Sequence, residues 1–229
     1  MKIMKKSVPW IVIPAFNASH TIVGVVRGLR DSGYNNIVVV DDGSRDGTYE
    51  SAVSTGVDVV RHVVNRGQGA SLQTGIRYSL TKNPSVVVTF DADGQHDPSD
   101  ISSLMQPVLS GDVDIALGSR FLKSSNVPLF RKIALKCGII VVYLFNGLLL
   151  TDAHNGIRCL SNDCARNLEI TSDRMEHASE IIEIIKKKGW RYKEVPVTVH
   201  YSDMSLRDGQ STLAAFRILG KMFWRKMIR

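Results

Sequence analysis

The chain has 229 residues, 44% hydrophobic and 22% charged, which is typical of a globular protein and excludes collagen-like, coiled-coil and wholly disordered classes. Its formal net charge of +7 indicates an anionic partner, such as nucleic acid, a phosphorylated substrate or a lipid headgroup. The sequence has no long lysine and arginine run and no zinc-finger or RNA-binding pattern, so we expect no nucleic-acid partner. The three cysteines form no CxxC pair, which favours reduced thiols in a cytoplasmic protein.

Short β-branched runs alternate with longer amphipathic segments in the first part of the chain. This alternation predicts an α/β fold, with a mostly parallel sheet flanked by helices. The expected strands lie at 10–14, 36–42, 57–63, 85–91 and 113–119. The expected helices lie near 19–31, 46–55, 68–81 and 98–109.

The pattern changes after residue 120. Segment 130–150 begins with basic residues and continues without a formal charge from Cys137 to Leu150. That run is short for a membrane span, so we expect a core or interfacial helix. A polar turn (TDAHNGIRCLS), a helix (SEIIEIIKKKG) and a strand (YKEVPVTVHY) are expected to follow.

Polar and acidic residues gather where the expected strands end. In parallel α/β sheets, ligands bind beyond the carboxyl ends of the strands. Four of these ends lead into the segments PAFN, DDGSRDGT, NRGQGASLQTG and DADGQHD. We therefore expect the functional site at this edge of the sheet.

The segment DADGQHD is a candidate metal site. Asp91 and Asp93 stand one residue apart at a strand end, so their side chains can share a face, and Gln95 can follow them. Oxygen ligands at this spacing suit Mg²⁺ or Mn²⁺, whose coordination is usually completed by substrate phosphates. The alternative is a solvated turn that caps the next helix. For Asp97, which precedes Pro98, we favour the helix cap.

Two other segments leave alternatives open. The aspartates of DDGS suit hydrogen bonds to a ribose or a base, or form an ordinary turn. The glycines of NRGQG allow backbone N–H groups to approach an anion at a helix start, or are only a glycine-rich connection.

Taken together, the motifs resemble one family. The segments IPAFN, VVDDGSRDGT, NRGQGASLQTGI, DADGQHDPSDI, GSRF and DAHNGIRCLS occur in one order with consistent spacing over roughly residues 8–212. They resemble the inverting glycosyltransferases with the GT-A fold, especially dolichyl-phosphate mannose synthases and bacterial polyprenyl-phosphate glycosyltransferases. The resemblance implies a GT-A catalytic domain over residues 1–212, a GDP- or UDP-sugar donor, Mg²⁺ or Mn²⁺, and a polyprenyl-phosphate acceptor.

The resemblance also implies roles for individual residues. The nucleotide would be lined by Pro14, Ala15 and Phe16, and its ribose or base held by Asp42. The donor diphosphate would be surrounded by Asp91, Ala92 and Asp93, with the metal on Asp93 and Gln95 and the phosphates facing Arg120 and Arg131. A metal and arginines there would stabilise the charge that develops on the leaving group.

The acceptor side departs from the family pattern. Arg207, in LRDGQST, is slightly displaced from the position of the basic residue that binds the acceptor phosphate, and a threonine replaces a lysine. Asp152 and Arg158 are candidate acceptor-side residues or, equally, members of a buried salt-bridge corner. Glu176 and His177 are candidates for a catalytic base if the acceptor is a hydroxyl, or they belong to a helix start.

Residues 213–229 predict a basic amphipathic C-terminal helix. Its basic residues recur at four-residue spacing, at Arg217, Lys221, Arg225 and Arg229. The apolar residues of a neighbouring face are Phe216, Leu219, Phe223 and Met227. This pattern suits an anionic membrane surface, the alternative being a helix packed on the domain. We therefore expect a peripheral protein on the cytoplasmic face of a membrane.

The favoured function is metal-dependent sugar transfer from a nucleotide sugar to a polyprenyl phosphate. The first alternative is transfer to a sugar hydroxyl in polysaccharide or glycolipid assembly. A nucleotidyltransferase or a non-catalytic nucleotide-binding protein would share the α/β layout. PAFNASH lacks the phosphate-cradling pattern of a nucleotidyltransferase, and the presence of Asp91, Asp93 and Arg120 argues against a non-catalytic protein.

Overall fold

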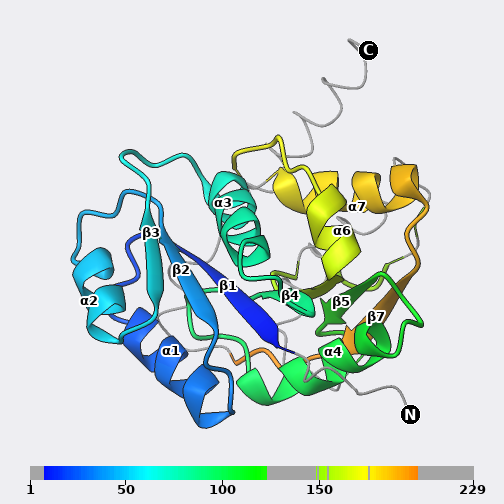
Figure 1. Cartoon of the computed structure of the whole chain (residues 1–229), viewed down its shortest axis with the longest axis horizontal. Helices are drawn as coiled ribbons and strands as arrows, with labels where there is room; N and C mark the ends of the chain where they lie inside the picture. The colour runs from blue at the N-terminus through cyan, green and yellow to red at the C-terminus, as the bar shows by residue number, and fades with distance from the viewer. Residues whose placement is uncertain (1–7, 123–147, 149, 154, 175, 201–229) are drawn as a thin grey trace.

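The computed structural model describes residues 8–122, 148, 150–153, 155–174 and 176–200 (Figure 1). The expectations for Arg131, Arg207, the helix at 213–229 and most of segment 130–150 concern residues outside these ranges. They remain predictions.

The described residues form a seven-stranded sheet with the order β3-β2-β1-β4-β6-β5-β7. Its strands are β1 (Pro9–Ala15), β2 (Ile37–Asp41), β3 (Asp58–Arg61), β4 (Val86–Thr89), β5 (Ile115–Ser119), β6 (Arg158–Ser161) and β7 (Tyr192–Pro196). All neighbouring pairs are parallel except those that β6 makes with β4 and β5. The predicted mostly parallel sheet is therefore confirmed.

Helices cover both faces of the sheet (Figure 1). The helices are α1 (Ile22–Asp31), α2 (Thr48–Ser54), α3 (Gln68–Leu80), the 3-10 turn η1 (Pro98–Asp100), α4 (Ile101–Leu109), α6 (Asn162–Asn167) and α7 (His177–Lys188). Side chains of α1 and α4 enter one apolar core, while those of α3, α6 and α7 enter another. Alternation along β1 serves both cores, since Ile11 and Ile13 face the first and Val12 the second.

The expected elements before residue 120 all exist, with ends shifted by a few residues. The interpretation of TDAHNGIRCLS as only a polar turn is wrong, because its last four residues form β6. Cys159 and Leu160 of β6 are buried on opposite faces of the sheet, and Cys159 pairs with Val88. A four-residue strand that begins with arginine and ends with serine has too few apolar positions to show a period. Its identity depends on the two strands beside it.

One smaller expectation, the capping role of Asp97, is confirmed. Asp97 is the N-cap of η1, where its carboxylate accepts a hydrogen bond from the backbone N–H of Ser99, with Pro98 in the first turn. Cys159 and Cys164 are free buried thiols. Within the described ranges, every helix is too short or too polar to cross a lipid bilayer.

Candidate active site

The loops that follow β1, β2 and β4 are joined at the carboxyl edge of the sheet. Asn17 donates its backbone N–H to Ser44 Oγ at 2.9 Å and accepts from the Arg45 N–H at 3.2 Å. Thr21 Oγ1 donates to the Ala92 carbonyl at 2.6 Å. The sequence-predicted residues of PAFN, DDGS and DADGQH thus lie on neighbouring loops of one edge. Phe16 is half exposed there.

Asp42 is buried in a network of its own. Its Oδ1 accepts from His62 Nδ1 at 2.7 Å and from the Arg66 N–H at 3.0 Å, and its Oδ2 accepts from the Gly67 N–H at 2.6 Å. His62 also bonds Thr74 Oγ1 at 2.9 Å. Both carboxylate oxygens therefore hold the loop between β3 and α3 in place. Asp42 as a ribose or base ligand stays a prediction.

The backbone N–H groups at the start of α3 are also used internally. Gly69 and Ala70 donate to the Asp173 carbonyl, at 2.8 and 3.2 Å. The contact depends on small residues, since a Cβ on Gly67 would lie 2.3 Å from the Asp173 oxygen and a Cβ on Gly69 2.0 Å from the Ser172 oxygen. Of the two interpretations of NRGQG, these contacts favour a close-packed connection over an anion site.

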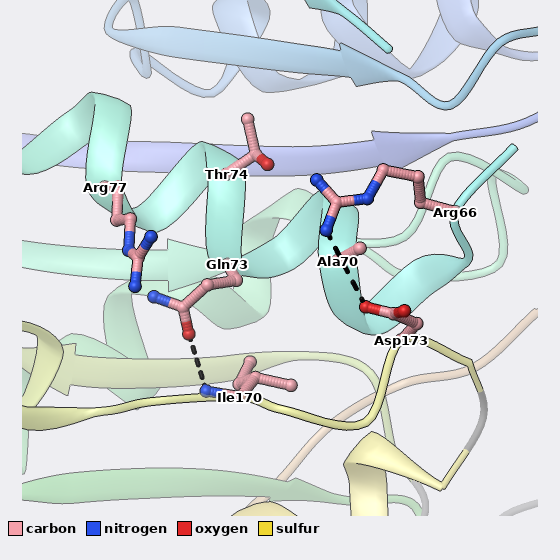
Figure 2. A pocket seen from close by; sticks show the side chains of 7 residues that line it. All are labelled: Arg66, Ala70, Gln73, Thr74, Arg77, Ile170 and Asp173. Carbon is pink, nitrogen blue, oxygen red and sulfur yellow. Dashed lines mark hydrogen bonds and ion pairs between the residues drawn. The ribbon is translucent and has the colours of Figure 1, made fainter. Parts of the chain in front are cut away.

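A polar groove separates α3 from segment 170–173 (Figure 2). Gln73 Oε1 accepts from the Ile170 N–H at 2.6 Å, and Arg66 Nη2 lies 4.0 Å from Asp173 Oδ1. Arg77 points into the same groove from the other end of α3 (Figure 2). These two contacts hold segment 170–173 next to α3 and the loop before it.

Asp91 is held from two sides at the end of β4. Gln68 Nε2 donates to its Oδ1 at 3.0 Å, and His96 Nε2 donates to its Oδ2 at 3.1 Å. The backbone of Gly156 presses against the same carboxylate, because a Cβ there would lie 1.9 Å from Oδ2. Neither Gln68 nor Gly156 was selected from the sequence. A glutamine in a glycine-rich loop and a glycine in a turn are too common to indicate this contact.

Asp93 differs from Asp91 in its surroundings. Its side chain is exposed, and its Oδ1 accepts from the Gln95 N–H at 3.0 Å. Partial desolvation and the negative charge of Asp91 raise the pKa of Asp93 above its usual value. A divalent cation would relieve this repulsion, and the donors here are carboxylate and amide oxygens, as Mg²⁺ and Mn²⁺ prefer. The residues present therefore fit such an ion, with most of its remaining ligands left to substrate and water.

Arg120 makes a buried ion pair. Its Nε lies 2.6 Å from Asp152 Oδ2, which also accepts from the Arg120 N–H and from Asn155 Nδ2. Arg158 is buried beside Asp91 and Asp152, and burial lowers its pKa. For Asp152, these contacts favour the buried salt-bridge corner. They place that corner next to Asp91.

His177 lies near Arg158 and Asp91. It is buried, and its Nδ1 donates to the Arg174 carbonyl at 2.7 Å. Burial and the nearby charge of Arg158 lower the pKa of His177 to about 4, so that it is neutral at pH 7. Glu176 occupies the N-cap position of α7, and its side chain makes no capping hydrogen bond.

Comparison with known protein families identifies the family of this chain. Residues 10–161 match the family described as glycosyl transferase family 2. The chain belongs to this family. An uncharacterised protein of Methanocaldococcus jannaschii is 40% identical over 95% of the chain and 92% of its own length.

Two relatives of this glycosyltransferase have informative names. The UDP-N-acetylglucosamine–dolichyl-phosphate N-acetylglucosaminyltransferase of Methanococcus voltae is 30% identical over 95% of the chain and 96% of its own length. The undecaprenyl-phosphate mannosyltransferase of Micrococcus luteus is 29% identical over 82% of the chain and 81% of its own length. The branch expected from the motifs is thus confirmed.

Solved structures agree on the fold. Glucosyl-3-phosphoglycerate synthase from Mycobacterium tuberculosis, crystallised with Mn²⁺, uridine diphosphate and phosphoglyceric acid, superposes with a TM-score of 0.67 at 15% identity. The match covers 94% of this chain and 79% of that one. The same synthase has also been crystallised with Mg²⁺ and uridine diphosphate. The predicted GT-A fold is confirmed.

Proposed function

We propose that this glycosyltransferase moves one hexose from a nucleotide sugar to a polyprenyl phosphate, with inversion at the sugar carbon, using Mg²⁺ or Mn²⁺. The observation that carries the proposal is the loop after β4, where an exposed Asp93 follows a partly buried Asp91 whose two oxygens are both hydrogen-bonded. Relatives that match 95% and 82% of the chain are named for transfer to dolichyl and undecaprenyl phosphate, respectively.

The metal would be held by Asp93 and Gln95, with the donor diphosphate supplying further oxygens. When bound, it would stabilise the negative charge that grows on the departing nucleoside diphosphate. The loop supplies orientation, because the Gln95 N–H fixes one oxygen of Asp93. The carbonyl of Gln95 accepts from the His200 N–H at 2.8 Å, which ties this loop to segment 197–200.

A phosphate acceptor also suits the protonation states of the cluster. A lipid phosphate is already anionic at pH 7 and attacks without a general base. His177 is neutral at this pH, but it is buried and its Nδ1 is used by the Arg174 carbonyl. Its surroundings give it the character of a packed core residue rather than that of an exposed base. This favours the phosphate acceptor over a sugar hydroxyl.

The proposal is tested by following radiolabelled sugar into lipid. The protein is incubated with UDP- or GDP-linked sugars, Mn²⁺ and either dolichyl or undecaprenyl phosphate, and label in the organic phase is counted. We expect label with one nucleotide and lipid phosphate, and none with the unphosphorylated polyprenol. Transfer to free sugars at the same rate, with none to lipid phosphate, would contradict the acceptor.

We also propose that the protein binds the cytoplasmic face of an anionic membrane through residues 213–229. Each basic residue near an anionic surface contributes about 1 kcal/mol, and salt screens this attraction. Truncation after Ser211 is expected to abolish salt-sensitive sedimentation with anionic vesicles while donor binding persists. Equal sedimentation of the truncated and full-length proteins would show that these residues do not anchor the protein.

A further inference from the structure

Asp91 is a partly buried carboxylate, and both of its oxygens are bonded to side chains of the protein. Gln68 Nε2 holds Oδ1 at 3.0 Å, and His96 Nε2 holds Oδ2 at 3.1 Å. His96 is buried and packs edge-on against Phe90, with ring centroids 5.6 Å apart. Its backbone also forms a bridge with Val199. The donor to Oδ2 is therefore fixed by packing as well as by its own hydrogen bond.

Gly156 closes the third side of Asp91. An added Cβ would come within 2.5 Å of all three carboxyl atoms, and this backbone is itself fixed. Thr89 Oγ1 donates to the Gly156 carbonyl at 2.7 Å and accepts from the Arg158 N–H at 3.1 Å. Residues of β4 and β6 thus fix the backbone of Gly156, which packs against the Asp91 carboxylate.

The charge of Asp91 is balanced inside the protein. Arg158 is 4% exposed, and no hydrogen-bond partner of its Nη1 is found among the described residues. Arg158 lies beside Asp91, and both Asp91 oxygens are bonded to side chains of the protein, unlike those of the exposed Asp93.

We propose that Gln68, His96 and Gly156 are positioning residues: they fix Asp91, and Asp91 anchors the loop so that Asp93 and Gln95 can face the ion. The inference rests on the proposed function, since it assigns roles within that site. Groups that orient a metal ligand typically change metal affinity by about 10- to 100-fold when removed. The same size of effect is expected here.

The test measures Mn²⁺ binding in the presence of UDP, by the electron paramagnetic resonance signal of free Mn²⁺. His96→Leu removes the donor to Asp91, and we expect its Mn²⁺ dissociation constant to rise at least about tenfold. His96→Gln keeps an N–H at a similar reach and should restore most of the affinity. A residue that only stabilises the fold would lower the melting temperature without this difference between leucine and glutamine.

Two aspartate variants separate anchor from ligand. Asp93→Asn should abolish Mn²⁺ binding with little change in melting temperature. Asp91→Asn should lower the melting temperature, because the buried Arg158 loses one of its two neighbouring negative charges, yet retain measurable Mn²⁺ binding. Gly156→Ala should resemble Asp91→Asn. Loss of binding in both aspartate variants, together with parental affinity in His96→Leu, would overturn the inference.

Different results would contradict the positioning roles and the proposed function. Parent protein that binds Mn²⁺ with UDP but transfers no sugar to lipid phosphate would contradict the proposed acceptor and leave the anchor in place. Parent protein that binds no Mn²⁺ with UDP would overturn both.

Discussion

Two pairs of aspartates lie at the ends of two parallel strands of this sheet, and they differ in exposure and in bonding partners. At the end of β2, Asp41 and Asp42 are both buried, and their carboxylates are bonded to Arg61, to His62 and to backbone N–H groups of nearby loops. After β4, Asp91 is partly buried and bonded to two side chains, but Asp93 is exposed to solvent. Only the second pair offers a carboxylate free to face a ligand.

The difference comes from the spacing of the pairs and from their neighbours. Adjacent residues at a strand end point to opposite faces, and each aspartate of the first pair meets a partner from β3 or from the loop after it. In the second pair the intervening Ala92 is buried, and Gly94 has a positive φ of 73°, so that the chain turns outward at Asp93. Aspartates at strand ends therefore serve either as loop anchors or as ligand donors.

The largest expected effect is on catalysis. Asp93→Ala should reduce metal-dependent turnover of the nucleotide sugar by at least about 100-fold, because stabilisation of the leaving group is lost. The fold should persist, since Asp93 is exposed. Turnover is measured by release of nucleoside diphosphate, and folding by circular dichroism. Full activity in this variant, or parental activity that EDTA leaves unchanged, would remove Asp93 from the metal site.

The corresponding change in the first pair should act on stability. Asp42→Ala leaves the N–H groups of Arg66 and Gly67 and the ring of His62 without their acceptor, which costs about 4 kcal/mol of unfolding free energy. The measurement is urea unfolding. Binding of UDP by the folded fraction reports separately on the predicted contact with ribose or base. If stability is unchanged and UDP affinity falls, Asp42 is a ligand rather than an anchor.

His177, which lies near Asp91, predicts that stability depends on pH. The pKa of His177 is lowered to about 4 in the folded protein, below its unfolded value of about 6.5. The unfolded chain therefore binds the proton first, and stability falls as the pH drops from about 6.5 to about 4, by at most about 3 kcal/mol. Unfolding at pH 7.5 and pH 5 measures the loss. His177→Asn should lose less stability between these two values, and an equal loss would assign the effect to other groups.

The smallest effect is expected at the third aspartate of the same loop. Asp97→Ala should cost about 1 kcal/mol of stability, because the Ser99 N–H loses its cap. Metal-dependent turnover should remain within a few-fold of the parent, in contrast with Asp93→Ala. Asp97→Ser keeps a capping oxygen and should recover the stability. A turnover loss like that of Asp93→Ala would place Asp97 in the metal site.

Much of the fold was predictable, because buried strands and amphipathic helices carry their period in the sequence. The strand at 36–42 and the helix near 68–81 are examples, and the capping role of Asp97 followed from the proline after it. The antiparallel strand β6 was not predictable, since its four residues show no period and depend on β4 and β5. Nor was the enclosure of Asp91, because Gln68 and Gly156 reach it from positions 23 residues before and 65 residues after it.

Asp93, the exposed aspartate of the second pair, is proposed to serve sugar transfer to a lipid phosphate. The most direct test incubates the protein with nucleotide sugar, polyprenyl phosphate and Mn²⁺, and identifies the released nucleotide by chromatography. We predict one nucleoside diphosphate for each lipid-linked sugar, and neither product with EDTA or with Asp93→Ala. Release of pyrophosphate, or nucleoside diphosphate without any lipid-linked sugar, would contradict the account.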